Sequence, residues 1–239
     1  MGIREVIGRL FFKKDEQNVI EVEMGLTTID EPAQTHLTKA LEGDKIGQYN
    51  FGIACIKGDG LPINMQRAIH WLTKSANQNY SKAQHILALI FLEGDGVEKN
   101  IIDGLYWLKK AAGNNYVESI RTLANLYLNG ICVNKDASEA NKWFKKASDL
   151  GDGESSCCLG VSYMRGVGVN KNEKRAYDLY KKAVSERDVR AKKYLADCYL
   201  WGLGTDKNID EASRLYLEAA QSGDEEAIAF LEKNRIYKR

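Results

Sequence analysis

The amino-acid sequence predicts an all-α fold, a right-handed α/α superhelical solenoid of five 36-residue helix–turn–helix repeats with N- and C-terminal capping helices. Two observations predict it. Glycines interrupt the chain at a constant step of 36 residues, at Gly58, Gly94, Gly130, Gly166 and Gly202. Apolar and small residues recur in columns with the same step. Such a period is typical of solenoids, in which stacked units bury apolar faces that no single unit can bury alone.

The first half of each repeat has the pattern of an amphipathic helix. A large apolar residue is followed by a small one at Phe51-Gly52, Leu87-Ala88, Leu123-Ala124, Leu159-Gly160 and Leu195-Ala196. An aromatic residue comes three positions later in four units, at Phe91, Tyr127, Tyr163 and Tyr199. This spacing places the residues on one helical face. The next glycine ends the helix, because it adopts the left-handed conformation without strain.

The second half of each repeat is predicted to be another helix. It begins after a residue that caps helix N-termini well, at Asn64, Asn100, Asp136, Asn172 and Asn208. Glu139 and Glu211 stand three positions beyond their caps, as in a capping box. The buried face carries large apolar residues at Trp71, Trp107, Trp143, Leu179 and Leu215. Asn79, Asn115, Gly151 and Gly223 are expected to close these helices.

The period divides the chain into segments. The five repeats occupy residues 45–80, 81–116, 117–152, 153–188 and 189–224. Residues 29–44 read as a degenerate half-repeat, and residues 225–239 as a C-terminal capping helix. Residues 1–28 lie outside the period and are expected to form an N-terminal capping and extended segment. The alternative for that segment is contact with a membrane surface, because residues 1–14 include several basic residues.

Composition argues against several classes of function. The formal net charge is only +1, whereas proteins that bind nucleic acid usually present a clearly basic face. The charge therefore argues against a nucleic-acid-binding protein. The five cysteines and three histidines show no zinc-ligand spacing and no arrangement for nucleophilic catalysis. The sequence therefore predicts no enzyme, no metal and no cofactor. The cysteines are expected to pack as apolar residues in a reducing compartment, and no run of apolar residues suits a membrane helix, so we expect a cytoplasmic protein.

These columns resemble the Sel1-like repeat family, which is related to the tetratricopeptide repeats. The resemblance covers residues 45–236 and is strongest at 81–116 and 117–152. The chain departs from the pattern at Ile131-Cys132, which replaces part of the glycine turn, and at Thr205, which replaces a valine. The resemblance implies an adaptor or scaffold, as in signalling, protein quality control or bacterial host interaction. The secreted branch has paired cysteines in each unit, and this chain lacks them, so disulfide bridges are not expected.

The functional signal lies in first-helix positions that vary while their neighbours stay constant. In tetratricopeptide solenoids these helices line a concave groove, so the resemblance implies that variable residues there bind another protein or peptide. The candidates are Tyr49, Lys57, His85, Glu93, Arg121, Asn125, Asn129, Arg165, Lys193, Asp197 and Trp201. Trp201 is the strongest, because the equivalent positions are polar and tryptophan often anchors interfaces. Its alternative role is packing beside the C-terminal cap.

Other functions stay open as alternatives. The resemblance admits an immunity protein that neutralises a bacterial toxin by occlusion, and also a penicillin-binding hydrolase, although the chain has no Ser-x-x-Lys motif. A row of lysines along the second helices would suit anionic lipid or nucleic acid, but a solvated face is the favoured interpretation; the row comprises Lys74, Lys110, Lys146 and Lys182, with Lys109, Lys145 and Lys181 beside it. The adjacent Cys157-Cys158 would suit a redox sensor, although core packing is favoured.

Overall fold

The computed structural model describes residues 29–233, so the expectations for residues 1–28 lie outside the described residues. Twelve helices and no strand occupy this range. The chain divides into two units, Met1–Lys74 and Ser75–Arg239, and each has its own core. The prediction of an all-α repeat solenoid is confirmed. The right-handed superhelix stays a prediction.

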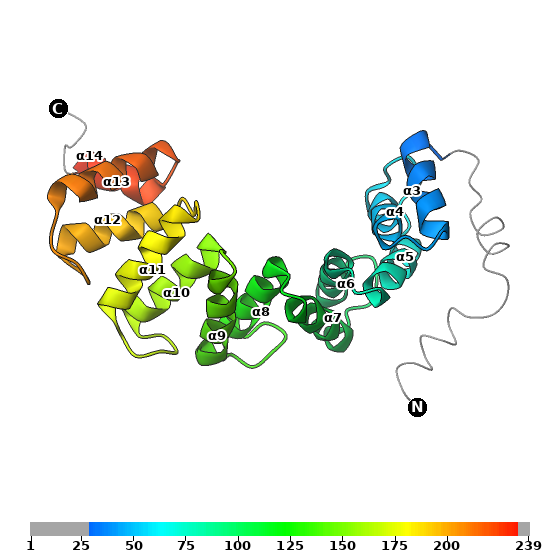
Figure 1. Ribbon diagram of the computed structural model, residues 1–239, viewed down its shortest axis with the longest axis horizontal. Helices are drawn as coiled ribbons and strands as arrows, with labels where there is room; N and C mark the ends of the chain where they lie inside the picture. The colour runs from blue at the N-terminus through cyan, green and yellow to red at the C-terminus, as the bar shows by residue number, and fades with distance from the viewer. Residues whose placement is uncertain (1–28, 234–239) are drawn as a thin grey trace. The chain divides into compact units, whose positions relative to one another are not determined.

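In the first unit, the described helices are α3 (Glu31–Leu41), α4 (Lys45–Lys57) and most of α5 (Met65–Asn77). The helices of the second unit follow one another in chain order in Figure 1. They are α6 (Ser81–Glu93), α7 (Ile101–Gly113), α8 (Val117–Asn129), α9 (Ala137–Asp149), α10 (Gly153–Arg165), α11 (Glu173–Ser185), α12 (Ala191–Trp201), α13 (Ile209–Gln221) and α14 (Glu225–Lys233). We call α4, α6, α8, α10 and α12 the first helices of the repeats, and α5, α7, α9, α11 and α13 the second helices.

The predicted N-caps of the second helices are confirmed. Each cap side chain accepts a hydrogen bond from the backbone N–H three residues later, as when Asp136 accepts from Glu139 at 2.9 Å. Such a cap stabilises a helix by about 1 kcal/mol relative to alanine. The carboxylates of Glu139 and Glu211 do not complete a capping box. They bind Lys142 and Arg214 instead, because a cation lies one turn farther along each helix.

The first helices end as predicted. The glycine after each one has a positive φ, between 71° and 78°, and its N–H donates to the carbonyl four residues earlier. The N–H of the next helix's cap then donates to the carbonyl of the aromatic column, for example Asp136 to Tyr127 at 2.8 Å. This pair of hydrogen bonds recurs in all five repeats and gives each turn the same closure.

In the first unit, α3 packs against α4, and their buried residues form one core. Phe51 and Trp71 meet edge to face with ring centroids 5.8 Å apart, an arrangement that aromatic pairs prefer. Gly52 allows α4 to approach α5 closely, since an added Cβ would lie 2.8 Å from Leu72 Cγ. The described part of this unit therefore uses the same small-to-large packing as the repeats of the second unit.

In the second unit, first and second helices of each repeat pack as pairs, and consecutive pairs pack on one another. The small column admits a large residue of the partner helix: a Cβ added at Gly160 would lie 2.6 Å from the Tyr180 ring. Tyr180 in turn stacks on Tyr194 of the next repeat, with centroids 5.3 Å apart. At the end of the unit, Phe230 of α14 stacks on Tyr216 at 4.1 Å.

The turn of the third repeat differs from the others, as its sequence suggests. At Gly168 an added Cβ would lie 2.4 Å from the backbone of Ala137, the first residue of the preceding second helix. Cys132 carries a Cβ at the equivalent position and holds a φ of 61°, which is unusual for a residue other than glycine. The turn must therefore stand away from α7. A shallow, open depression lies there, lined by residues that include Ile101 and Cys132.

The contact between Gly160 and Tyr180 is directly testable. We expect Gly160→Ala to lower the free energy of unfolding by about 1–3 kcal/mol, because the new methyl group overlaps the Tyr180 ring. Gly113→Ala is the matched control: an added Cβ there meets nothing within 4 Å, so alanine should leave stability unchanged or raise it by up to about 1 kcal/mol. Urea denaturation measures both. Equal effects of the two substitutions would contradict the packing described here.

Candidate protein-binding surface

The predicted binding residues all lie on first helices. Tyr49 and Lys57 belong to α4 in the first unit, and the other nine belong to α6, α8, α10 and α12 in the second. Nine of the eleven fall into two groups of different character. One group makes polar contacts with another helix and is called here the joint residues: His85, Arg121 and Lys193 contact the next repeat or α14, and Asp197 contacts α13 of its own repeat. The other group consists of the last residue of each first helix and is called here the end column: Lys57, Glu93, Asn129, Arg165 and Trp201.

The joint residue His85 links α6 to the start of α8. Its Nδ1 lies 2.9 Å from the hydroxyl of Ser119, and its ring lies 5.4 Å from that of Tyr116. Burial lowers the pKa of this imidazole, and the nearby Arg121 guanidinium lowers it further, while Glu118 acts in the opposite direction. The neutral ring is therefore the form that the folded chain favours.

Arg121 continues the same role one repeat later. Its guanidinium lies 2.7 Å from Asp152 and 3.0 Å from Glu154, at the N-terminus of α10. Glu154 also lies 3.3 Å from Arg190, which in turn pairs with Asp188 at 3.0 Å. An ion-pair chain thus crosses three repeats. Arg121 is already bound within the chain, which leaves it less available to a partner than its sequence position suggests.

Lys193 connects the last repeat to α14, and Asp197 joins the two helices of that repeat. The ammonium of Lys193 lies 2.5 Å from Glu226 of α14 and 3.5 Å from Asp197. Burial acts to lower the pKa of Lys193, but the carboxylates of Glu226 and Asp197 outweigh it and raise the pKa. Asp197 accepts a hydrogen bond from the hydroxyl of Tyr216 at 2.5 Å. These two residues hold α12, α13 and α14 together.

The end column presents its side chains to solvent. All five members are exposed, and the Trp201 side chain has an exposed fraction of 60%. Within the second unit, Glu93, Asn129, Arg165 and Trp201 occupy the same position in consecutive repeats. Tyr49 and Asn125 are half-buried and lie one or two turns earlier on their helices. The role of all these residues in binding stays a prediction.

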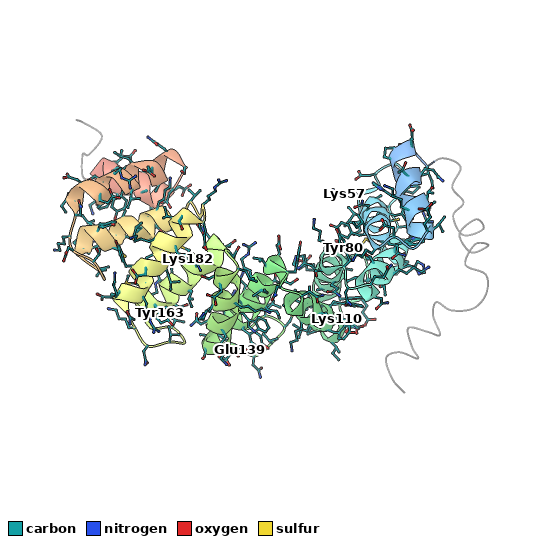
Figure 2. The ribbon with its side chains drawn as sticks, viewed as in Figure 1. Lys57, Tyr80, Lys110, Glu139, Tyr163 and Lys182 are labelled. Atoms are coloured by element: carbon teal, nitrogen blue, oxygen red, sulfur yellow. The ribbon has the colours of Figure 1, made fainter. Side chains whose placement is uncertain are left out.

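The lysine row is not the freely solvated face that its sequence suggests. Lys146 donates to the carbonyl of Ala112 at 2.8 Å, and Lys182 to the carbonyl of Ser148 at 2.6 Å. Each acceptor lies at the C-terminal end of the preceding second helix, where a cation is favourable. Figure 2 labels Lys110 and Lys182 of this row. Their neighbours Lys109, Lys145 and Lys181 are exposed, as expected of a solvated face.

The adjacent cysteines have the properties of core residues. Burial raises the pKa of Cys157 to about 12 and that of Cys158 to about 11. A thiol with a raised pKa supplies little of the thiolate that oxidises readily. Cys157 is buried and Cys158 is half-buried, and neither forms a disulfide. This environment favours packing over redox sensing.

The ion-pair chain was missed by sequence reasoning. Asp152 and Glu154 give no distinctive signal, because acidic residues are common at helix N-termini, and Arg190 and Asp188 precede a helix without an evident pattern. The one available signal is the arginine at a column that carries histidine and lysine in other repeats. Within residues 29–233 no cluster of ligating side chains suits a metal ion. Over the same range no helix has the length and apolar content to cross a membrane.

The buried histidine generates a pH prediction. Since the folded pKa of His85 is lowered, the unfolded chain takes up a proton first as the pH falls below about 6.5. Stability should therefore be complete above that pH, and fall on acidification until the folded-state pKa is passed. His85→Gln should remove this part of the fall, whereas His36→Gln should retain it because His85 is intact. Urea denaturation between pH 7.5 and about 5 measures it, and an identical profile for wild type and His85→Gln would contradict it.

The inter-repeat role of the lysines can be measured by a matched pair. Lys146→Met should destabilise the chain by about 1 kcal/mol, because it removes the hydrogen bond to Ala112 at a helix C-terminus. Lys145→Met removes an exposed lysine that pairs with Asp149 on its own helix, and should cost less than about 0.5 kcal/mol. Thermal or urea unfolding compares the two. Equal losses of stability in the two variants would contradict the inter-repeat role and would indicate that the lysines form an ordinary solvated face.

Comparison with known proteins agrees with this architecture. A search of the curated proteins found no match. Among solved structures, a Sel1 repeat protein from Oxalobacter formigenes is 28% identical with a TM-score of 0.69, covering 84% of this chain and 87% of its own. A protective antigen of uropathogenic Escherichia coli strains, described as having an SLR fold, is 27% identical with a TM-score of 0.77. The match covers 81% of this chain but 42% of the antigen, so the chain spans less than half of that protein's length.

Weaker likenesses and the family model complete the comparison. An immunity protein from Pseudomonas aeruginosa covers 93% of the chain, and 75% of its own length, at 21% identity and a TM-score of 0.47, too distant to argue for a shared activity. The model of the Sel1 repeat matches residues 46–80, 81–116, 118–152, 155–188 and 189–224. These matches span well over half of the sequence and include all five helix pairs of the period. The chain therefore belongs to the Sel1 repeat family.

Proposed function

We propose that this chain is a non-catalytic scaffold that binds another protein through the end column of the second unit, with Trp201 as its anchor. The observation that carries the proposal is that Trp201 is exposed and is the last residue of its first helix, a position that recurs in every repeat. Sel1 repeats typically mediate protein interaction, which supports the general role.

The chemistry of the end column suits protein recognition. A tryptophan that is 60% exposed offers a large apolar surface for burial and an N–H group for a hydrogen bond. Arg165 stands one repeat earlier, and no described carboxylate forms an ion pair with it. Arginine and tryptophan are enriched among residues that dominate binding energy. A partner segment with an apolar residue and a carboxylate one repeat apart would complement this pair.

The arrangement of serine and lysine in the second unit argues against hydrolysis. Lys182 lies 3.0 Å from the Ser148 hydroxyl, and Ser148 contacts Ser156 at 2.8 Å. A lysine that activates serine must be able to lose its proton. Here Lys182 already donates to the backbone carbonyl of Ser148 at 2.6 Å and pairs with Glu186 at 3.7 Å, so it is engaged in joining α9 to α11. Ser148 and Ser156 are also buried, so this cluster is better suited to joining repeats than to attacking a substrate.

A cytoplasmic location is part of the proposal. Its support is the environment of the thiols: Cys55, Cys157 and Cys198 are buried among apolar residues, and burial raises the pKa of each. Thiols packed in this way need no oxidising compartment for stability.

The binding proposal is tested with the partner that co-purifies with the full chain. We expect Trp201→Ala to weaken its affinity by about 30-fold or more, since loss of a hot-spot tryptophan costs about 2 kcal/mol or more. Arg165→Ala should weaken it as well, by a smaller factor. Ile102→Ala is the matched control, because this side chain is 71% exposed but lies on a second helix. Calorimetric titration gives the affinities, and circular dichroism verifies folding. Unchanged affinity in both end-column variants would refute the assignment.

A further inference from the structure

The second helices carry a repeated pairing of tryptophan and lysine. In the first three repeats a lysine three residues after the tryptophan lies over its ring: Lys74 is 4.9 Å from the Trp71 centroid, Lys110 is 5.3 Å from Trp107, and Lys146 is 5.7 Å from Trp143. A cation at this distance over an indole is attracted by the negative face of the ring. The pairing is a constant feature of three consecutive repeats.

The fourth repeat keeps the lysine and lacks the ring. Leu179 occupies the tryptophan position, and Lys182 follows it at the same spacing. Lys182 still reaches back to Ser148, as Lys146 does to Ala112, so its stem has the same course. The fifth repeat has Leu215 with Glu218, and Leu215 is buried. Among the five repeats, the fourth alone therefore has the lysine of this pairing without the tryptophan.

A hollow lies where the missing indole would be. It has a volume of about 380 Å³, and its lining includes Leu179 and Lys182 from α11 and Leu159 and Tyr163 from α10. Figure 2 labels Tyr163 and Lys182. An apolar protein cavity of about 150 Å³ already holds a benzene molecule, so this hollow has room for an aromatic side chain. Leu159 and Leu179 supply an apolar floor.

The charges at the edge of the hollow favour an acidic ligand. The carboxylates that line it are already paired: Asp149 lies 2.6 Å from Lys145, and Asp178 lies 3.1 Å from Lys174. Arg175 has no carboxylate partner among the described residues. It donates to the hydroxyl of Tyr163 at 3.2 Å and is exposed. Its guanidinium can therefore donate two parallel hydrogen bonds to a carboxylate of a ligand.

We propose that this hollow, between α9, α10 and α11, is a second binding site that receives a tryptophan side chain from an acidic segment of a partner protein. The incoming indole takes the place that Trp143 and its equivalents fill in earlier repeats. Lys182 covers its face, and Arg175 binds a carboxylate beside it. The site is separate from the end column, because its lining, which comes from α9, α10 and α11, includes no end-column residue.

The proposal is tested with short peptides on the full chain. The probe is capped Asp-Trp-Asp, compared with capped Asp-Leu-Asp and Lys-Trp-Lys, in an NMR titration of 15N-labelled protein. We expect the amide signals of Ser148, Asp149 and Leu179 to shift, and the acidic tryptophan peptide to bind at least about threefold more tightly than either comparison peptide. Shifts spread over the surface, or equal affinities, would overturn the proposal.

Leu179→Trp is the sharpest variant, because it supplies the indole from the chain itself. It should abolish the localised shifts and raise the melting temperature. Lys181→Gln, on an exposed neighbour that does not line the hollow, is the matched control and should bind as wild type does. Should Leu179→Trp fail to fold, Arg175→Glu gives an independent test. Because it replaces the cation at the edge of the hollow with a carboxylate, this variant must bind Lys-Trp-Lys more tightly than Asp-Trp-Asp. Undiminished binding by folded Leu179→Trp, or an unreversed preference in Arg175→Glu, contradicts the site.

The two proposals fail separately. Trp201→Ala should leave the peptide titration unchanged, because Trp201 does not line the hollow. If the peptide shifts the Trp201 signals instead of those of Leu179, the hollow is not the site, while the end-column proposal stands. If the peptide binds the hollow but Trp201→Ala leaves the affinity of the co-purified partner unchanged, the hollow is a binding site and the end-column proposal fails.

Discussion

The close approach of helices through small residues is the constraint on which the rest of this molecule depends. At Gly160 the distance to the Tyr180 ring leaves no room for a methyl group, and in the first repeat Gly52 lies similarly close to Leu72. Because a small residue recurs at this position every 36 residues, each repeat is built on the same close approach of its two helices. Everything outside the constant contacts, including the end column and the hollow, is free to differ between repeats.

Polar contacts link consecutive repeats in addition to this apolar packing. Histidine, arginine and lysine at one column each reach the next first helix or α14, and the second-helix lysines reach the carbonyl end of the helix before them. Individually such exposed pairs contribute little, but the half-buried members are screened less by solvent. They also join partners about 30 residues apart, which fixes how repeats follow one another rather than how one repeat folds.

The sequence predicted the fold well, because its signals are local. Cap residues, turn glycines and the helical spacing of apolar residues act within a few positions, and all are confirmed in the structure. The partners of side chains were predicted poorly. Arg121 finds Asp152, and Lys146 finds the Ala112 carbonyl, across a repeat boundary that no local pattern describes. The change from Trp143 to Leu179 is visible in the sequence, but only the packing of α9 against α10 and α11 shows that it opens a hollow.

The most direct test of the account is the contact between consecutive repeats in solution. Nuclear Overhauser effects should join the ring protons of Tyr180 to the α-protons of Gly160, and the rings of Tyr180 and Tyr194, whose centroids lie 5.3 Å apart. Both sets together would establish that the fourth repeat is closed on itself and stacked on the fifth in the stated register. The absence of both in a folded chain, or connection of Tyr180 to a different repeat, would contradict the frame on which both binding surfaces rest.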